Sequence, residues 1–189
     1  MKDNIILEND NLILKPLAYL KPEELSSEAV IKIADDYDIA KYVGHQFPSP
    51  YTIKDAEDYF GICKISWISE KEYVFAIFRK SDNEYMGNIG FALNKEDKVV
   101  SNIGYWLGKK YAGNGYMTQA VKIMLDFCFN ELKVRKIEAY VFEGNIASQK
   151  VLENNGFIKE GLRRKKHMLR DGEILDDMCY GLLKEEYKK

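Results

Sequence analysis

The stretch YAGNGYMTQAV, residues 111–121, places two glycines one residue apart directly before an amphipathic helix. The first backbone N–H groups of a helix lack internal partners, and the helix dipole adds partial positive charge there, so an anion such as a phosphate is a natural ligand. Gly113 and Gly115 remove the side chains that would keep it away and permit positive φ angles. The stretch therefore predicts a phosphate cradle. The alternative is a tight turn that packs on the sheet and needs glycine only for its backbone angles.

The spacing of these glycines excludes two familiar phosphate-binding motifs. The pattern GxxxxGK[ST] of P-loop proteins is missing, and so is the pattern GxGxxG of dinucleotide folds. A phosphate cradle at this place must therefore belong to another class of protein.

The bulk properties of the chain restrict its class. Its 189 residues favour a single domain over residues 1–189, and a net charge of -2 gives no basic field for nucleic acid. The basic segment RRKKHMLR, residues 163–170, favours a solvated strand face over a contact with a phosphate or an acidic partner. The three cysteines are scattered and no signal peptide is visible, which predicts a cytoplasmic protein. With only two histidines and no clustered cysteines, we expect no metal site. No apolar run is long enough to span a bilayer, so we expect no membrane contact.

The order of apolar patterns along the chain predicts a mixed sheet with helices on its faces. Residues 11–17 read as a strand, 27–43 as a helix, and a second helix begins at an N-cap on Thr52 with Asp55 as its capping-box partner. Strands at 72–80, 84–93 and 101–108 precede a helix over 116–132, whose crossover should bring the strand at 136–144 parallel to the one before it. A short helix within 145–157 and two strands around a turn at Asp171 and Gly172 close the fold, which has about seven strands.

Two segments of the chain resemble GCN5-related N-acetyltransferases, the GNAT superfamily. The pattern [Q/R]-x-x-G-x-[G/A] falls on Lys110, Gly113 and Gly115, with lysine in place of the usual glutamine or arginine. The segment NIASQKVLENNGF, residues 145–157, is similar to the family's N-x-x-S-x-x-V-L-x-x-x-G-F. With further similarities at 12–17, 47–60 and 175–183, the resemblance covers nearly the whole chain. It points to the branch that contains bacterial ribosomal-protein N-terminal acetyltransferases, and it implies the GNAT fold, a mixed and mostly antiparallel α/β (α+β) sheet with helices on both faces.

The resemblance implies that acetyl-CoA is the cosubstrate and that the acetyl group passes directly to a primary amine, either a protein N-terminus or a small amine, in a ternary complex. In the family the central strand splays from the next one, and its exposed backbone holds the pantetheine arm like an added strand. The residues implied to bind acetyl-CoA are Tyr105, Trp106, Leu107, Gly108, Lys110, Tyr111, Ala112, Gly113, Asn114, Gly115, Tyr116, Asn145 and Ser148. No metal is implied, and a homodimer is left open.

The resemblance also implies catalytic roles. Ser148 matches a serine of this branch that is a proposed proton donor to the CoA thiolate, although an ordinary helix serine is the alternative. The branch often has a glutamate as base where this chain has Asn102. The candidate base is therefore Glu143, at the end of the strand that precedes Asn145. Asp176 and His45 are further candidates, the first to orient the amine or brace the hairpin. Because Asn102 cannot act as a base, the sequence also allows the alternative that the protein binds CoA as a sensor and has no catalytic activity.

The acceptor pocket is the least determined part of the sequence. Phe47, Tyr51, Trp67 and Trp106 offer aromatic surface for an acceptor, and the alternative is that they fill the core. The sequence does not distinguish an N-terminal peptide from a polyamine, an amino acid or an antibiotic as the acceptor.

Overall fold

The computed structural model describes residues 5–44, 47–169 and 171–187. The helices are α1 (Ser27–Ala34), α2 (Tyr37–Val43), α3 (Ile53–Ile68), α4 (Tyr116–Asn130) and α5 (Ile146–Asn154), with 3-10 turns at Leu17–Tyr19 and Lys109–Tyr111. The strands are β1 (Leu7–Glu8), β2 (Leu12–Pro16), β3 (Glu72–Arg79), β4 (Glu84–Asn94), β5 (Val99–Leu107), β6 (Lys136–Phe142), β7 (Ile158–Met168) and β8 (Ile174–Leu183).

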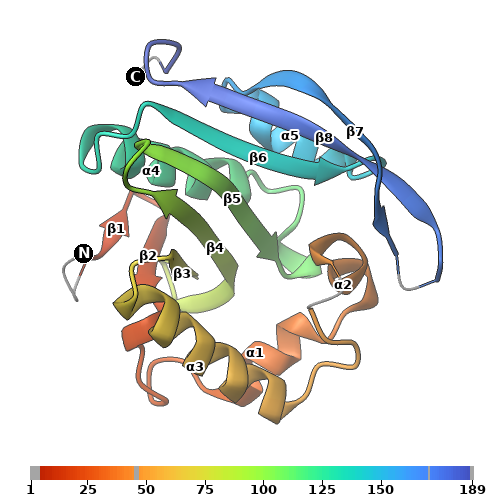
Figure 1. The fold of residues 1–189 in the computed structure, drawn as a ribbon. Coiled ribbons are helices and arrows are strands. Elements are labelled where there is room, and N and C mark those ends of the chain that lie inside the picture. The colour runs from red at the N-terminus through yellow and green to blue at the C-terminus, as the bar shows by residue number, and fades with distance from the viewer. Residues whose placement is uncertain (1–4, 45–46, 170, 188–189) are drawn as a thin grey trace.

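These strands form one sheet in the order β1-β2-β3-β4-β5-β6-β8-β7 (Figure 1). Only β5 and β6 pair in parallel, because α4 connects them by a crossover, and the other neighbouring strands are antiparallel. The predicted mixed, mostly antiparallel sheet is confirmed. The sheet has one strand more than predicted, since the two-residue β1 is too short to give a sequence pattern.

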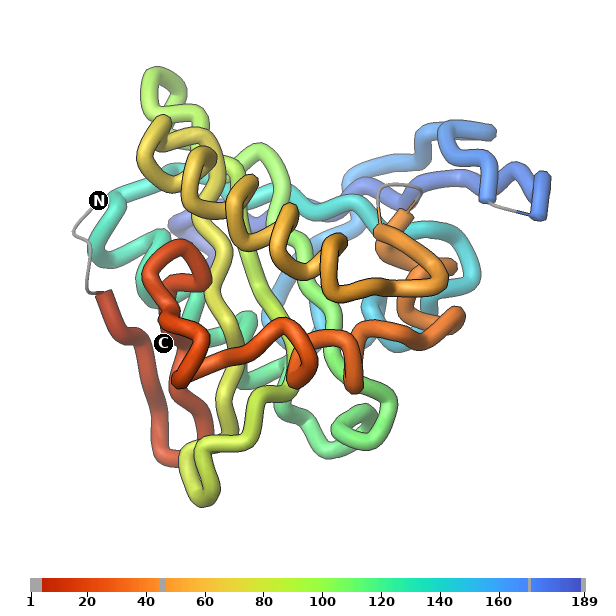
Figure 2. The backbone as a smooth tube through the Cα atoms, turned by 90° about the horizontal axis from the view of Figure 1, so that it is seen from below, coloured from red at the N-terminus to blue at the C-terminus, as the bar shows by residue number. Residues whose placement is uncertain are grey.

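Both faces of the sheet are buried, and alternation along β3 shows how. Tyr73, Phe75 and Ile77 pack into the core under α4, whereas Val74 and Phe78 pack on the opposite side against α1 and α3. Figures 1 and 2 show α4 and α5 on one side of the sheet and α1, α2 and α3 on the other. Helices on both faces were predicted, and this arrangement brings the starts of α4 and α5 to the same end of β5.

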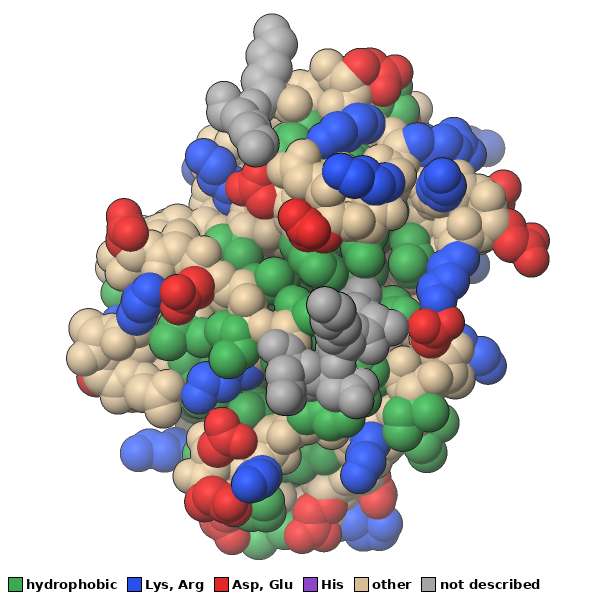
Figure 3. All heavy atoms as spheres, turned by 90° about the vertical axis from the view of Figure 1, so that its left-hand side faces the viewer, with side chains coloured by type: hydrophobic (Ala, Val, Ile, Leu, Met, Phe, Trp, Pro, Cys, Tyr) green, Lys and Arg blue, Asp and Glu red, His purple; other side chains and the backbone are tan. Residues whose placement is uncertain are grey.

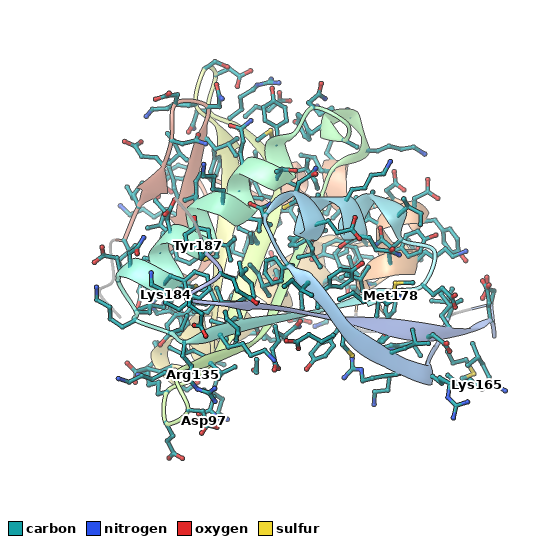
Figure 4. The ribbon with its side chains drawn as sticks, turned by 90° about the horizontal axis from the view of Figure 1, so that it is seen from above. Asp97, Arg135, Lys165, Met178, Lys184 and Tyr187 are labelled. Atoms are coloured by element: carbon teal, nitrogen blue, oxygen red, sulfur yellow. The ribbon has the colours of Figure 1, made fainter. Side chains whose placement is uncertain are left out.

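The parallel strands β5 and β6 diverge soon after they begin. Their pairing consists of Val99 with Lys136 and Val100 with Ile137, whereas β6 pairs with β8 along its whole length. At the closed end the backbone N–H of Arg135 donates to the Lys98 carbonyl at 2.8 Å, and its Nε donates to the Asp97 carbonyl at 2.7 Å. Figure 4 shows Asp97 and Arg135 together at this end, far from Lys165 on β7. The splay expected from the family resemblance is therefore present, and its open end lies toward Leu107.

The helix predicted over residues 27–43 is wrong in one respect, because it breaks into α1 and α2. Asp36 caps α2 by accepting a hydrogen bond from the Asp38 N–H at 2.8 Å. The neighbouring Asp35 accepts one from the Tyr51 N–H at 2.9 Å, which ties the break to the segment before α3. Tyr37, the first residue of α2, is 53% exposed. Aspartate side chains compete with the helix for backbone N–H groups, which explains the break.

The start of α3 is as predicted. The Thr52 hydroxyl accepts from the Asp55 N–H at 3.3 Å, and the Asp55 carboxylate accepts from the Thr52 N–H at 2.8 Å. Two orphan donors are thereby satisfied, which fixes where α3 begins.

The molecular surface carries charges of both signs. On the face shown in Figure 3, Lys and Arg side chains alternate with Asp and Glu, without a field of one sign. The β7–β8 hairpin, which carries Arg163 to Lys166, projects from the body (Figure 2); Arg170 of the same basic segment lies outside the described residues. Among the described helices, none combines the length and apolar character needed to cross a membrane.

Candidate active site

The glycine-rich loop before α4 has the geometry of an anion cradle. Gly113 and Gly115 have φ angles of +78° and +73°, in the left-handed region that favours glycine. A Cβ at either position would meet nothing within 4 Å, so the backbone here faces open space. Gly115 is the N-cap of α4 and supplies no side-chain cap to the N–H groups of its first turn. These donors suit a phosphate ligand, and the residues present fit the diphosphate of acetyl-CoA.

The loop forms one wall of a cavity of about 750 Å³, a volume typical of ligand sites. The end of β5, the start of α4, the start of α5 and parts of α2 complete its lining. The residues predicted to bind acetyl-CoA that line this cavity are Tyr105, Trp106, Leu107, Tyr111, Ala112, Gly113, Gly115, Tyr116, Asn145 and Ser148. The tertiary structure thus brings both sequence motifs to one site.

Three residues predicted to bind acetyl-CoA lie beside the cavity rather than in its lining. A Cβ on Gly108 would sit 2.3 Å from the Ile33 side chain, so this glycine permits α1 to pack against the end of β5. The Asn114 amide donates to the Tyr111 and Ala112 carbonyls at 3.3 and 3.1 Å, which holds the loop in shape. For Gly108 and Asn114 the structure supports a role in shaping the site.

Lys110 is the third of these residues, and its ammonium is engaged in an ion pair. Its Nζ donates to Glu84 on β4 at 2.5 Å and lies 4.7 Å from the centre of the Tyr111 ring. The hydrogen bond that Lys110 donates to Glu84 raises the pKa of Lys110. The positive charge that Lys110 brings close to the cradle is therefore partly neutralised by Glu84.

Two residues of α5 connect the helix cap to a hydroxyl pair. The Asn145 side chain caps α5 by accepting from the Ser148 N–H at 3.1 Å, which commits its amide oxygen and leaves its amide nitrogen for a ligand. The Ser148 hydroxyl lies 3.0 Å from the Tyr105 hydroxyl, and burial raises the pKa of Tyr105, so this phenol stays protonated. Sequence reasoning assigned Tyr105 only a backbone role, because no sequence signal joins a strand residue to a helix residue so far along the chain.

A second cavity of about 290 Å³ shares Tyr105, Asn145 and Ser148 with the first. It opens between the splayed strands, where Asn102 of β5 and Tyr140 of β6 line it. Its far wall comes from the β7–β8 hairpin, which contributes Arg163, His167 and Asp177. Two cavities therefore meet at the Tyr105–Ser148 pair.

The structure places the candidate bases apart from one another. Glu143 is exposed, and it lines neither cavity. The Asp176 carboxylate accepts from the Lys165 N–H at 2.7 Å, which braces the hairpin. His45 lies outside the described residues. Among the described residues that line the second cavity, the acidic one is Asp177, which is 0% exposed. The sequence analysis named the adjacent Asp176 instead, because residue type alone does not distinguish two neighbouring aspartates.

The four aromatic residues expected near the acceptor divide into two groups. Phe47, Tyr51 and Trp106 pack together, with ring centres 5.0 Å apart for Phe47 and Tyr51 and 5.6 Å apart for Phe47 and Trp106. Trp67 instead packs against Tyr73 and Phe75 in the core at 5.0 and 5.3 Å. Trp67 and Tyr51 are buried and line neither cavity, so for them the core alternative holds. Trp106 is buried too, but it lines the larger cavity.

Known proteins resemble the chain in sequence and in fold. The acetyltransferase (GNAT) domain model matches residues 12–158. The chain is 42% identical over 97 residues to the probable N-acetyltransferase YjcK of Bacillus subtilis, covering 51% of this chain and 54% of that protein's length. It is 28% identical over 179 residues to the uncharacterized N-acetyltransferase p20 of Bacillus licheniformis, covering 94% of this chain and 98% of that protein.

A solved structure of RimL, a ribosomal L7/L12 alpha-N-protein acetyltransferase in complex with coenzyme A, superposes with a TM-score of 0.82. It covers 95% of this chain and 98% of that one at 19% identity, and shows the shared fold. The sheet, the splay and the glycine-rich cradle define a CoA-type acyltransferase. The chain belongs to the GNAT acetyltransferase family, as the resemblance implied. Its acetyl donor is acetyl-CoA, and among the described residues no cluster of three metal-ligating side chains occurs.

Proposed function

We propose that the chain transfers the acetyl group of acetyl-CoA to the α-amino group of a peptide N-terminus, in a complex that holds both substrates at once. The observation that carries this proposal is the meeting of the two cavities at Tyr105, Asn145 and Ser148. A donor in the larger cavity and an acceptor in the smaller one would face each other there. The likeness to RimL, described as an alpha-N-protein acetyltransferase, supports a protein N-terminus as the acceptor.

The donor is held mainly by backbone in this proposal. N–H groups from residues 113–116 bind the diphosphate, since Gly113 and Gly115 carry no side chain to obstruct it. The N–H groups of Tyr111 and Ala112, expected to join them, instead donate to the Gly108 and Lys109 carbonyls at 2.9 and 3.1 Å. The open edge of β5 from Tyr105 to Leu107 holds the pantetheine arm. A backbone N–H near Trp106 or Leu107 stabilises the oxyanion that forms on the acetyl carbonyl.

The transfer itself makes one bond and breaks another. The neutral amine attacks the acetyl carbonyl carbon, the new C–N bond forms, and the C–S bond to CoA breaks. Ser148 donates its hydroxyl proton to the departing thiolate and is reprotonated from solvent through the Tyr105 hydroxyl 3.0 Å away, so that both hydroxyls are restored. The amine must lose a proton as well, because α-amino groups have a pKa of about 8 and are mostly charged at neutral pH. The nitrogen gives up its second proton to solvent as the tetrahedral intermediate collapses.

A panel of amines with acetyl-CoA tests the proposal. We would incubate the protein with short peptides that differ in their first residue, with the same peptides blocked at the N-terminus but containing lysine, and with small polyamines. Mass spectrometry should show one added acetyl group on the free N-terminal peptides only. Acetylation of the blocked peptides or the polyamines would move the acceptor to another class. Tight CoA binding without acetylation of any amine would favour the alternative, a CoA-binding sensor, for which Asn102 is the supporting residue.

The cytoplasmic location expected from the sequence stays a prediction.

A further inference from the structure

The second cavity contains a buried carboxylate with one uncommitted oxygen. Asp177, on β8, has a side chain that is 1% exposed. Its Oδ2 accepts from Arg163 Nη2 and lies 2.9 Å from His167 Nε2, both on β7. Its Oδ1 is buried and has no hydrogen-bond partner among the described residues. Buried polar atoms are almost always paired, so this carboxylate has the capacity for one further hydrogen bond.

His167 is held by this carboxylate in a defined orientation. Asp177 accepts a hydrogen bond from Nε2, so the proton of the neutral imidazole resides on Nε2 and the lone pair on Nδ1. The Phe142 ring meets the imidazole edge-on with centres 4.6 Å apart, which fixes the plane of the ring. The His167 side chain is 35% exposed and lines the cavity, so Nδ1 is the ring atom available to a substrate. A carboxylate that orients a histidine in this way is a common arrangement in catalytic sites.

The charged neighbours of His167 come from three elements. Arg163 on β7 and Asp177 on β8 form one ion pair next to it. From α2, Lys41 lines the small hollow that also contains His167, and its ammonium is 3.8 Å from Glu173, near the turn of the hairpin. Each cation beside the imidazole is therefore paired with a carboxylate.

The reaction needs a proton acceptor in this cavity, and few of the side chains that line it can serve. The amide of Asn102 cannot take a proton, Arg163 remains charged, and the tyrosines are already protonated. We propose that His167 is the general base of the reaction and that Asp177 positions it. Resting on the proposed function, the acceptor ammonium transfers a proton to His167 Nδ1, directly or through one water. The freed lone pair attacks the acetyl carbon, and His167 later returns its proton to solvent.

The pH dependence of kcat/KM tests this proposal. It is measured with acetyl-CoA and with each peptide that the wild-type protein acetylates in the amine panel. In the wild type we expect activity to fall at low pH along a one-proton limb that stays in place when peptides of different α-amine pKa are compared. His167→Gln should lower kcat/KM at pH 7 by about 100- to 1,000-fold and abolish this limb. Asp177→Asn should lower kcat/KM and shift the limb. Lys166→Gln, an exposed change on the same strand, is the control and should alter neither.

The outcomes separate the inference from the proposed function. If His167→Gln lowers the melting temperature but keeps the limb, the pair is structural and the inference is overturned. Loss of the limb in His45→Gln would assign the base to the other histidine and overturn it as well. In both cases wild-type acetylation would leave the proposed function intact. Failure of the wild type to acetylate any amine would overturn both.

Discussion

The side-chain hydroxyls of Tyr105 and Ser148 lie 3.0 Å apart although the residues are separated by 43 positions in the sequence. Tyr105 belongs to the open edge of β5, and Ser148 belongs to the first turn of α5. The pair bridges the divergence of β5 and β6 and forms the wall common to both cavities. Donor and acceptor would therefore meet beside two hydroxyl groups that can pass a proton.

We expect Ser148→Ala to lower kcat by about 10- to 100-fold while the Kd of CoA changes little, because the hydroxyl serves the leaving thiolate rather than binding. Tyr105→Phe should give a smaller loss, since Ser148 can then exchange its proton with water. Ser69→Ala is the control, because that serine only caps the end of α3, where its hydroxyl donates to the Ile65 carbonyl. Steady-state kinetics and calorimetric CoA titration measure the two effects. Unchanged turnover in Ser148→Ala would remove this serine from the role of acid.

Gly113→Val should weaken CoA binding more than it lowers the melting temperature. The branched side chain would project into the space where the diphosphate is proposed to bind, since a Cβ there meets no protein atom within 4 Å. The left-handed backbone adds strain, so the control is Gly172→Val, which has a φ of +87° in similarly open space at the β7–β8 turn. Both variants should lose similar stability, and only Gly113→Val should lose CoA affinity. Equal CoA affinity in the two variants would assign the glycines to the turn alone.

Glu84→Gln should strengthen CoA binding by about two- to fivefold, because it releases the Lys110 ammonium beside the cradle. The gain should decrease with added salt, since both side chains are exposed. Glu70→Gln breaks a similarly exposed pair with Lys95, far from the cradle in sequence, and should leave CoA affinity unchanged. A salt series of CoA titrations compares the variants. A loss of affinity in Glu84→Gln would mean that the ion pair holds the loop in its binding shape.

Stability should fall in alkaline solution. Burial raises the pKa of the Cys63 thiol from 9.0 to about 12, so between these pH values the unfolded chain has lost a proton that the folded chain keeps. The unfolded state then binds fewer protons, and the free energy of unfolding decreases as pH rises. This contribution is complete below about pH 9 and is lost as pH rises toward 12. Urea unfolding across this range should show a shallower decline in Cys63→Ala, with Cys128 causing part of the remainder because burial also raises its pKa. Parallel declines in both proteins would contradict this assignment.

The local features of the sequence predicted the local structure well. Glycine is tolerant of positive φ, so the paired glycines located the start of α4, and the Thr52 capping box located the start of α3. The hydrophobic patterns predicted the order of strands and helices, and the two motifs indicated the family. The helix over 27–43 was predicted as continuous, because apolar spacing does not report the two aspartates that compete for its backbone.

The sequence by itself determined the family and the donor, and it predicted the position of the cradle, because these depend on backbone geometry that short glycine and cap motifs encode. Only the tertiary structure decided which side chains meet at the two cavities. Tyr105 with Ser148, and His167 with Asp177, come from separate elements whose distances depend on strand divergence and hairpin register. Because β7 contains register shifts between residues 159 and 161 and between 163 and 167, alternation alone could not place His167 in a cavity.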